Sequence, residues 1–369
     1  MSTKTPRDFF KPLAIGAPAP MHDLPIRLER MIHFVPPHLA KVRAKVPTMA
    51  ERLAGHGGAV MLSSASPGAA FMHDPERHGE IYHRSGSRGP GGRPLDDDGL
   101  TAEATMEDDI GLARAFCERI LPRRAALSVL WLSHPDKVMH KVPLGSSAHM
   151  AAVAGADACL GMVVEAVDNM RAAGEDVLLM AGSDHGHQTV VRTVDVDAAL
   201  FAAGLKDRLD STEVSFAPQG TSGHIYLAPH VAGRAEAIAA FLSAQDWCGV
   251  VVAGERLATF GHTGENGLAV LFCGPELSAP SASAPGGAVA FHRHDEAPAP
   301  IGYGQHGGLG THEQAPVLIA DGGGFGASVC REPTDIADIA PTILAHLGLA
   351  TDGMDGRVLQ TLAPAARVA

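Results

Sequence analysis

The chain has 369 residues, 46% of them hydrophobic, and a formal net charge of −12 at pH 7. This length suits one large α/β domain or two smaller ones, with enough apolar side chains for a sizeable core. The acidic balance, without a block of Lys and Arg, excludes a general nucleic-acid-binding protein but allows a small phosphorylated substrate.

The cysteines predict a reducing compartment. They are odd in number, widely spaced and without a CxxC pair, which is typical of reduced thiols: Cys117, Cys159, Cys248, Cys273 and Cys330. The N-terminal residues hold no apolar stretch of the length of a secretory signal, and no run of about 18 apolar residues predicts a membrane span. We therefore expect a cytoplasmic protein without a membrane partner, and the oligomeric state stays open.

Helical and strand patterns alternate from residue 47 onward. Apolar spacing and end signals predict helices at 47–57, 110–122, 147–173, 195–205, 232–243 and 334–349. Short apolar runs predict strands at 58–64, 125–133, 176–182, 221–229, 268–274 and 315–323. This alternation favours the α/β class, with a mostly parallel sheet covered on both faces by helices.

Three less regular segments bear on the domain organisation. Residues 1–46 show no clean period and carry Pro interruptions, so we interpret them as an atypical N-terminal segment. Residues 84–109 are rich in Gly, Pro and charge and predict an exposed loop. We expect one catalytic domain over 47–360, with a flexible insertion at about 278–300.

Ionisable pairs accompany three of the predicted strands. One pair follows the strand at 125–133, one follows 176–182, and one precedes 315–323. The pairs are Asp136 with His140, Asp184 with His185, and His306 with His312. Asp and His bind Zn²⁺ and similar divalent ions, and strand ends of an α/β sheet meet at one edge, so the pairs predict a common metal site.

Each pair alone has a plainer explanation. Asp136 and His140 could be neighbours on a helix face, and Asp184 could cap a turn. The two late histidines could be exposed in their Gly-rich loop. The order of the three pairs along the chain is what favours the metal interpretation.

The segments around these pairs resemble a known superfamily. Asp136–His140, the S-D-H-G run at 183–186, and H-G-G before E-x-x-P-V-L-I (313–319) resemble the alkaline phosphatase superfamily. The type I phosphodiesterase/nucleotide pyrophosphatase branch and phosphonoacetate hydrolase are the most similar. The tail at 334–359, with a PT-hydrophobic-LG helix before an M-D-G turn, is similar as well.

The resemblance implies an α/β/α sandwich with two divalent metals, usually zinc. Asp136, His140 and a late histidine would bind one metal, and Asp184 with His185 would bind the other. His306 is the preferred late histidine, and His312 is the runner-up. The metals would clamp the attacking and leaving oxygens of an in-line displacement at phosphorus.

The family also has an early Asp in a D-G segment and a Thr or Ser nucleophile after it. Residues 1–46 contain no D-G, so the chain is expected to lack the segment that carries both. Ser64 and Ser66, with Ser63 beside them, are fallback nucleophiles. The second metal would keep two protein ligands, fewer than the three of a usual catalytic zinc site, so the second site would be incomplete.

Three further residues are candidates for substrate contacts: Lys137, His187 and His224. The sequence thus predicts a metal-dependent hydrolase of phosphodiester or nucleotide pyrophosphate bonds. A catalytically impaired homologue that binds metal or a phosphorylated ligand is one alternative. A hydrolase of phosphonates or phosphomonoesters is another.

Overall fold

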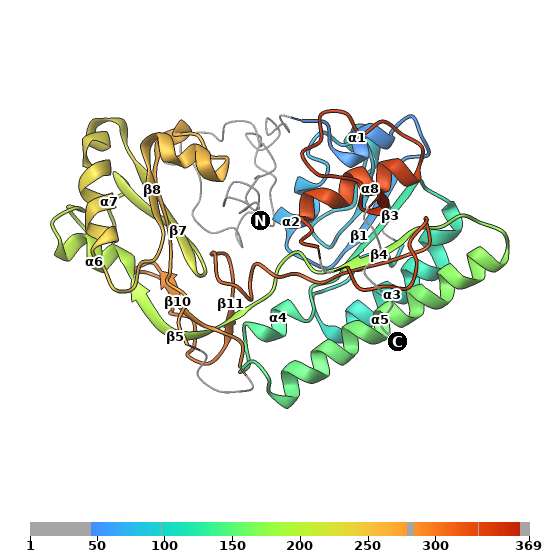
Figure 1. Ribbon diagram of the computed structural model, residues 1–369, viewed down its shortest axis with the longest axis horizontal. Helices are drawn as coiled ribbons and strands as arrows, with labels where there is room; N and C mark the ends of the chain where they lie inside the picture. Colours follow the sequence, from blue (N-terminus) through green and yellow to red (C-terminus); the bar gives the residue numbers. More distant parts are fainter. Residues whose placement is uncertain (1–45, 97, 279–283, 331, 362–369) are drawn as a thin grey trace. The chain divides into compact units, whose positions relative to one another are not determined.

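The computed structural model describes residues 46–96, 98–278, 284–330 and 332–361 (Figure 1). These residues form two compact units, each assembled from separate stretches of the chain. Unit 1 contains Pro135–Val153 and His185–Val317. Unit 2 contains the described residues up to His134, then Ala154–Asp184 and the residues from Leu318 onward. The predicted boundary at residue 46 adjoins residues outside the described part and stays a prediction.

Unit 2 is built on a small parallel sheet. Its strands lie in the order β2 (Glu80–Tyr82), β1 (Ala59–Ser63) and β3 (Leu127–Trp131). A second pair, β4 (Leu179–Gly182) and β12 (Leu318–Asp321), is antiparallel. Side chains of β1 pack against apolar residues of α3 (Met106–Ala115) and of the turns that follow it, including Leu112, Phe116 and Ile120.

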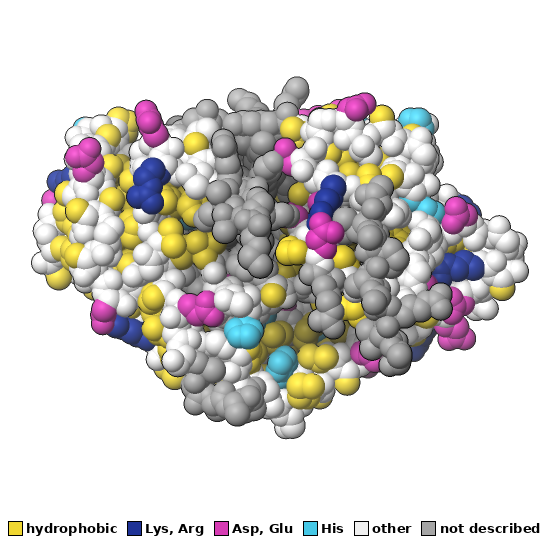
Figure 2. Space-filling model, viewed as in Figure 1, with side chains coloured by type: hydrophobic (Ala, Val, Ile, Leu, Met, Phe, Trp, Pro, Cys, Tyr) yellow, Lys and Arg dark blue, Asp and Glu magenta, His cyan; other side chains and the backbone are white. Residues whose placement is uncertain are grey.

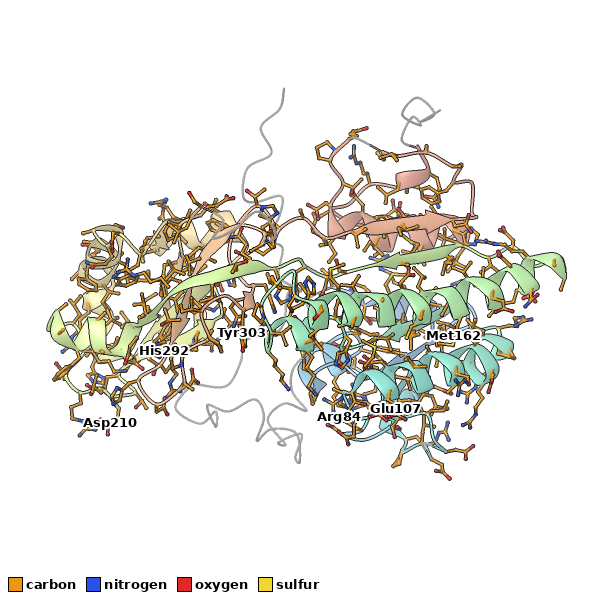
Figure 3. All side chains as sticks on the ribbon, turned by 90° about the horizontal axis from the view of Figure 1, so that it is seen from below. Arg84, Glu107, Met162, Asp210, His292 and Tyr303 are labelled. Carbon is orange, nitrogen blue, oxygen red and sulfur yellow. The ribbon has the colours of Figure 1, made fainter. Side chains whose placement is uncertain are left out.

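Shorter elements complete unit 2. Its other helices are α1 (Met49–Leu53), α2 (Pro67–Met72) and α8 (Ile339–His346). A π-helical turn spans Phe116–Ile120, and 3-10 turns span Pro90–Gly92, Leu121–Arg123, Ile336–Asp338 and Leu359–Thr361. Figure 3 labels Arg84 and Glu107 in this unit.

Helix α5 (Ser147–Ala172) continues from unit 1 into unit 2. By length and composition it is the one helix of the described residues that could cross a membrane, with a mean hydropathy of 1.7. In the structure its Val163 and Val167 are buried in the hydrophobic core of unit 2. Only 22% of the most apolar stretch of α5 is buried, so one stripe of the helix packs on the core and the rest of it does not.

Unit 1 contains two sheets. The first has the order β10 (Gly287–His292), β5 (Gln188–Asp195) and β11 (Gly304–Gln305); β10 is parallel to β5, and β11 is antiparallel to it. The second is antiparallel throughout. Its strands lie in the order β6 (Val214–Gln219), β7 (Ser222–Leu227), β9 (Leu268–Cys273) and β8 (Val251–Ala253).

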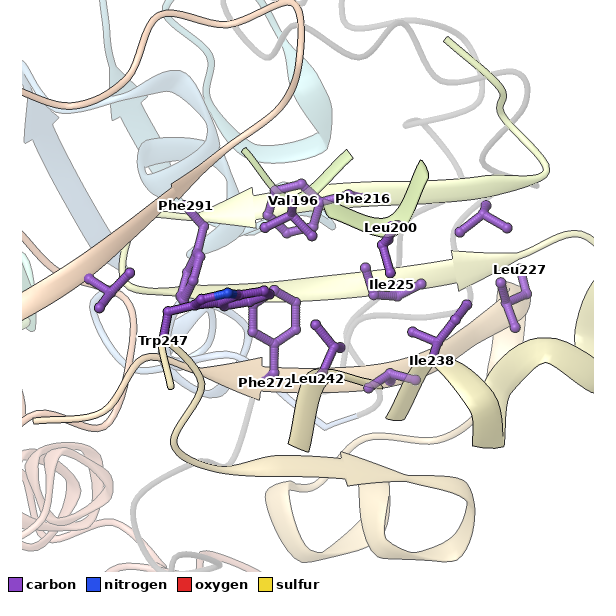
Figure 4. Packing of buried hydrophobic residues seen from close by; sticks show 13 residues of the cluster. Val196, Leu200, Phe216, Ile225, Leu227, Ile238, Leu242, Trp247, Phe272 and Phe291 are labelled. Atoms are coloured by element: carbon purple, nitrogen blue, oxygen red, sulfur yellow. The ribbon is translucent and has the colours of Figure 1, made fainter. Parts of the chain in front are cut away.

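The helices of unit 1 are α4 (Asp136–Met139), α6 (Val196–Ala202) and α7 (Ala235–Ser243). Its 3-10 turns span Pro229–Arg234, Gly254–Phe260 and Glu265–Gly267. Figure 4 shows the core that these elements share, in which Phe216, Ile225 and Phe272 of the strands meet Ile238 and Leu242 of α7. Aromatic rings pack edge-on there, with Trp247 and Phe291 6.0 Å apart between centroids.

The α/β class is confirmed, and beside the parallel sheet of unit 2 the structure has an antiparallel pair, a mixed sheet and an antiparallel sheet. The prediction of a flexible insertion at 278–300 is wrong for residues 287–292, which form the buried strand β10. The small residues of Gly287–Ala290 look like a linker in the sequence. They form a strand because β5 supplies hydrogen-bond partners that no local pattern shows.

Candidate metal centre

Short helix α4 presents the first two residues of the site. Asp136 is its first residue and His140 caps its C-terminal end, so that the two side chains lie on one face at the i, i+4 spacing. His140 Nε2 lies 3.2 Å from Asp136 Oδ1. The other ring nitrogen, Nδ1, lies 3.1 Å from the carbonyl oxygen of Gly304 and fixes the orientation of the ring.

Two further histidines come from one end of the antiparallel β5–β11 pair, where Gln188 lies opposite Gln305. His187 immediately precedes β5, and its Nε2 atom lies 2.8 Å from Asp136 Oδ1. His306 immediately follows β11, with Nε2 3.5 Å from the same oxygen. Ring nitrogens of three histidines therefore surround one carboxylate oxygen, Oδ1 of Asp136.

His185 completes the group. Its ring stacks on that of His306 with 3.5 Å between centroids. One potential ligand atom from each of Asp136, His185, His187 and His306 lies within 4.8 Å of all the others. Three imidazoles and a carboxylate form a donor set that suits Zn²⁺ and related ions.

Electrostatics set the protonation states of this group. Burial by itself would raise the pKa of Asp136, but hydrogen bonds from His140, His187 and His306 hold it well below its usual value. Burial lowers the pKa of His187 to about 4, although Asp136 partly opposes that shift. At neutral pH the carboxylate is thus ionised and His187 neutral, which are the forms that bind metal.

The surroundings of His187 also fit a bound ion. Its side chain is 3% exposed, and its Nδ1 atom is buried without a hydrogen-bond partner among the described residues. A Cβ atom on Gly304 would lie 2.8 Å from this nitrogen, so a side chain at that position would displace the imidazole. A buried ring nitrogen without a hydrogen-bond partner, in a histidine beside an ionised carboxylate, fits a metal ligand, because a bound ion would be the missing partner.

A buried glutamate holds the loop that carries His306. Glu313 is 2% exposed and accepts hydrogen bonds from Thr221 Oγ1 at 2.6 Å and from the backbone N–H groups of Gly308 and Gly310 at 2.9 Å each. The Thr221 N–H donates to the carbonyl oxygen of His306 at 3.1 Å. The hairpin between β6 and β7 thereby fixes the position of His306.

Glycine is required at the tip of that hairpin. Gly220 has a φ of +67°, and a Cβ atom there would lie 2.1 Å from the carbonyl oxygen of His306. Both the left-handed conformation and the close approach exclude a larger residue without a shift of the loop.

The structure separates the histidines that the sequence left as alternatives. His306 lies in the cluster, whereas His312 is exposed and outside it, with its backbone N–H donating to Gln188 Oε1 at 3.3 Å. The resemblance pairs His185 with Asp184, but the structure groups His185 with Asp136 and His306. Asp184 is exposed and belongs to unit 2, where it raises the pKa of His73 against a larger lowering by burial.

The fallback nucleophiles have structural roles. Ser64 is completely buried, donates a hydrogen bond to Asp109 and accepts one from the Ser133 N–H at 2.9 Å. A hydroxyl enclosed in this way has no room for a substrate phosphorus, so the structure does not support Ser64 as a nucleophile. Ser66 is exposed and caps α2, accepting from the Ala69 N–H at 3.3 Å.

The sequence interpretation underrated His187 and did not single out Glu313. The spacing of two residues between His185 and His187 could have identified His187 as a site residue. Residues two apart on an extended segment point to the same face. His185 and His187 both precede β5 at that spacing. Glu313 carried no such signal, since its burial depends on Thr221, which lies 92 residues earlier.

Solved structures with a similar fold come from phosphoryl and phosphonate hydrolases. Murine ectonucleotide pyrophosphatase/phosphodiesterase 5, as an inactive variant in complex with AMP, matches with a TM-score of 0.54 and 17% identity over 82% of this chain and 70% of that one. Phosphonoacetate hydrolase from Sinorhizobium meliloti 1021, in complex with phosphonoformate, matches with a TM-score of 0.54 and 14% identity over 84% and 75%. At these identities the matches establish the fold alone.

Among curated proteins, a malyl-CoA/β-methylmalyl-CoA/citramalyl-CoA lyase from Chloroflexus aurantiacus is 52% identical over 50 residues. That stretch is 14% of this chain, and the chain spans only 14% of the length of the lyase. The model of the type I phosphodiesterase/nucleotide pyrophosphatase family, by contrast, matches residues 41–245, more than half of the chain. The chain therefore belongs to the type I phosphodiesterase/nucleotide pyrophosphatase family.

Proposed function

We propose that the protein is a metal-dependent hydrolase of phosphoesters that acts on phosphodiester or nucleotide pyrophosphate bonds. The observation that carries the proposal is the convergence of His140, His187 and His306 on one oxygen of Asp136. Family membership supports hydrolysis at phosphorus, and members of the family depend on metals. Zinc is the proposed ion, because imidazole-rich sites with one carboxylate suit it.

Asp136, His185, His187 and His306 would hold this ion. When bound, a divalent metal polarises a phosphoryl oxygen and stabilises the charge that develops on it. Asp136 keeps its charge at neutral pH and orients the three rings around it. Glu313 and the β6–β7 hairpin hold His306 in position, which lowers the entropy lost when the ligands order around an ion.

The substrate class is supported by what similar folds bind. One neighbour was solved with AMP and another with a phosphonate, so both ligands carry a tetrahedral phosphorus group. The acidic chain needs a local positive charge to attract such a group, and the ion supplies it. On the face shown in Figure 2, the described Lys and Arg side chains are scattered and do not gather in one patch.

The burial of Ser64 favours a second candidate function. A homologue that binds metal or a phosphorylated ligand without turnover would retain the histidine cluster and lose the attacking hydroxyl. A reducing location such as the cytoplasm also stays a prediction; it is supported by the five cysteines, all of which are free thiols.

Hydrolysis assays test the proposal. Chelator-treated protein is titrated with Zn²⁺ or Mn²⁺ and assayed on bis-p-nitrophenyl phosphate, and phosphate release from phosphonoacetate is measured in parallel. Asp136→Ala and His306→Ala are compared with His312→Ala, a matched control because His312 is exposed and outside the cluster.

We expect metal-dependent turnover that falls by about 100-fold or more in the first two variants, the range for losing a metal ligand or its partner, and stays unchanged in the third. Metal binding without turnover on either substrate would select the non-catalytic candidate. A protein that binds no metal would contradict both.

A further inference from the structure

Three arginines of unit 2 lie near one another without an acidic partner. In this chain of net charge −12, most of the described arginines form an ion pair with a carboxylate, as Arg123 does with Glu80. Arg77, Arg88 and Arg93 form no ion pair with any residue that the structure describes. A guanidinium is always charged in proteins, so these three side chains bring positive charge that no carboxylate pairs with.

Two of the guanidinium groups lie beside one turn, the 3-10 turn at Pro90–Gly92. The Gly92 N–H closes this turn by donating to the carbonyl oxygen of Gly89 at 2.9 Å. A Cβ atom on Gly92 would lie 2.6 Å from Arg77 Nη1, and a Cβ atom on Gly89 would lie 3.4 Å from Arg93 Nη2. Because the two glycines are the ends of the same turn, both guanidinium groups are close to the same few backbone atoms.

The backbone fixes Arg77 in this position. Its N–H donates to the carbonyl oxygen of Asp74 at 3.2 Å, and its own carbonyl oxygen accepts from the Gly91 N–H at 2.8 Å. Its φ of +68° lies in the left-handed region, which a residue with a side chain seldom adopts. The half-buried guanidinium that this conformation presents has no hydrogen-bond partner within the described ranges, so its five donors are available to a ligand.

Arg88 adds a third positive charge next to this pair. Its Nη2 atom donates to the same carbonyl oxygen of Asp74 at 2.9 Å, and its guanidinium lies 4.6 Å from the centre of the Phe71 ring. Burial lowers the pKa of Arg88, the charge of Arg77 lowers it further, and Asp74 opposes both. An anion beside Arg77 would relieve this repulsion between like charges.

The acidic side chains of the neighbouring segments have other partners. The Asp74 carboxylate is buried and accepts two backbone N–H groups of the turn that follows it, at 2.9 and 2.8 Å. Glu76 lies 3.8 Å from His78 Nε2. Asp96 accepts the Asp98 N–H at 3.3 Å, and the carboxylate of Asp98 pairs with an arginine outside this group. The three arginines therefore keep an excess of positive charge.

We propose that Arg77 and Arg93 bind a phosphate group, with Arg88 adding positive charge beside them. The planar donors of a guanidinium match the oxygens of phosphate, and a doubly charged anion gains more from three positive charges than a singly charged carboxylate does. The site lies in unit 2 and shares no residue with the metal-ligand cluster. It therefore does not depend on the proposed function.

Isothermal titration calorimetry on the full-length protein tests the site, at a sodium chloride concentration of about 0.15 M that screens nonspecific attraction. The ligands are inorganic phosphate and glycerol 3-phosphate. Arg77→Gln and Arg93→Gln each remove one guanidinium, and Arg77→Lys keeps the charge without the planar donors. Arg114→Gln is the matched control, because Arg114 is exposed on α3 of the same unit and has no ion pair among the described residues.

We expect saturable binding of phosphate whose affinity falls by about tenfold in Arg77→Gln and in Arg93→Gln, as for the loss of a hydrogen bond between charged groups. Arg77→Lys should lose less, and Arg114→Gln should bind as the original protein does. Glycerol 3-phosphate that binds more tightly than inorganic phosphate would identify the phosphate of a larger molecule as the ligand. Equal or weaker binding would identify the free ion.

Asp136→Ala separates this site from the metal-ligand cluster, and phosphate binding should persist in that variant. Binding that is lost in Asp136→Ala and kept in both Gln variants would place the phosphate at the cluster and overturn the proposal. The absence of saturable binding, or an equal loss in Arg114→Gln and Arg93→Gln, would overturn it as well. Thermal melts check folding, and the exposed Arg93 keeps the test valid if Arg77→Gln does not fold.

Discussion

Burial fixes the charge of individual histidines in unit 1. His187 and His224 each have a pKa of about 4, although only His187 has a carboxylate partner. In both, desolvation of the imidazolium is the largest cause. His140 differs, because its hydrogen bond and charge interaction with Asp136 overcome burial and raise its pKa.

His224 makes the stability of unit 1 sensitive to acid. Its pKa is about 6.5 in the unfolded chain and about 4 in the folded one, so the unfolded state binds more protons between these values. The free energy of unfolding therefore falls as the pH drops from 6.5 to 4, by up to about 3 kcal/mol from this residue. Urea denaturation at several pH values measures the slope.

The variant His224→Leu removes the titrating group and should flatten that part of the slope. Equal slopes in the original protein and His224→Leu would show that His224 is not buried in its neutral form.

Glu313 is the residue on which the position of His306 depends. Glu313→Gln replaces a charged acceptor that receives three hydrogen bonds by an amide with one acceptor oxygen. We expect a loss of about 2–3 kcal/mol in stability, since hydrogen bonds to charged groups are the stronger ones. Zn²⁺ affinity should fall as well, measured by competition with a chelating dye.

Glu276→Gln is the control for this prediction. Its carboxylate accepts from Thr311 Oγ1 at 2.8 Å in an exposed pair near the same loop. Zn²⁺ affinity that falls equally in both variants would mean that Glu313 has no special role in positioning His306.

At the scale of elements, Asp109 connects the ends of β1 and β3. From α3 it accepts a hydrogen bond from Ser64, which follows β1, and its other oxygen lies 2.7 Å from His134 Nδ1 and 3.1 Å from the His134 N–H. Asp109 is fully buried. These bonds hold the chain just before Asp136, the central residue of the metal-ligand cluster.

Asp109→Ala should therefore destabilise the protein strongly. Removal of the carboxylate leaves Ser64, Ser133 and His134 without their shared partner, and we expect a loss of about 3 kcal/mol or more. Chemical denaturation provides the measurement. Glu107→Ala, an exposed change on the same helix, should cost less than about 0.5 kcal/mol, and an equal cost for both would contradict the role of Asp109.

At the scale of the whole molecule, metal binding should appear as thermal stabilisation. An ion that binds only the folded state adds about 2.7 kcal/mol when its concentration is 100 times the dissociation constant. Scanning calorimetry of chelator-treated protein with added Zn²⁺ should therefore show a higher Tm. Asp136→Ala should abolish the increase, and His312→Ala should keep it. A similar increase in Asp136→Ala would place the bound ion elsewhere.

Local patterns predicted much of the architecture. The strands β1, β3, β4, β7, β9 and β12 and the helix α5 all lie within segments whose apolar runs or helical spacing indicated them. The strands that local patterns missed are short or depend on distant partners. β5 and β10 pair with each other across about a hundred residues, and the hairpin partner β6 contains a proline at position 218.

By itself, the sequence determined the type of protein: an acidic α/β chain whose Asp and His pairs follow or precede its strands in the order of a phosphoryl-hydrolase family. Those features are local, because strand and helix periods and short motifs are read over a few residues. Tertiary structure alone decided that His187 joins Asp136, that His312 does not, that Ser64 is buried, and that His224 and His262 face one cavity. Each of these depends on packing between segments far apart in the chain, where burial and hydrogen-bond partners are set by residues that no local pattern contains.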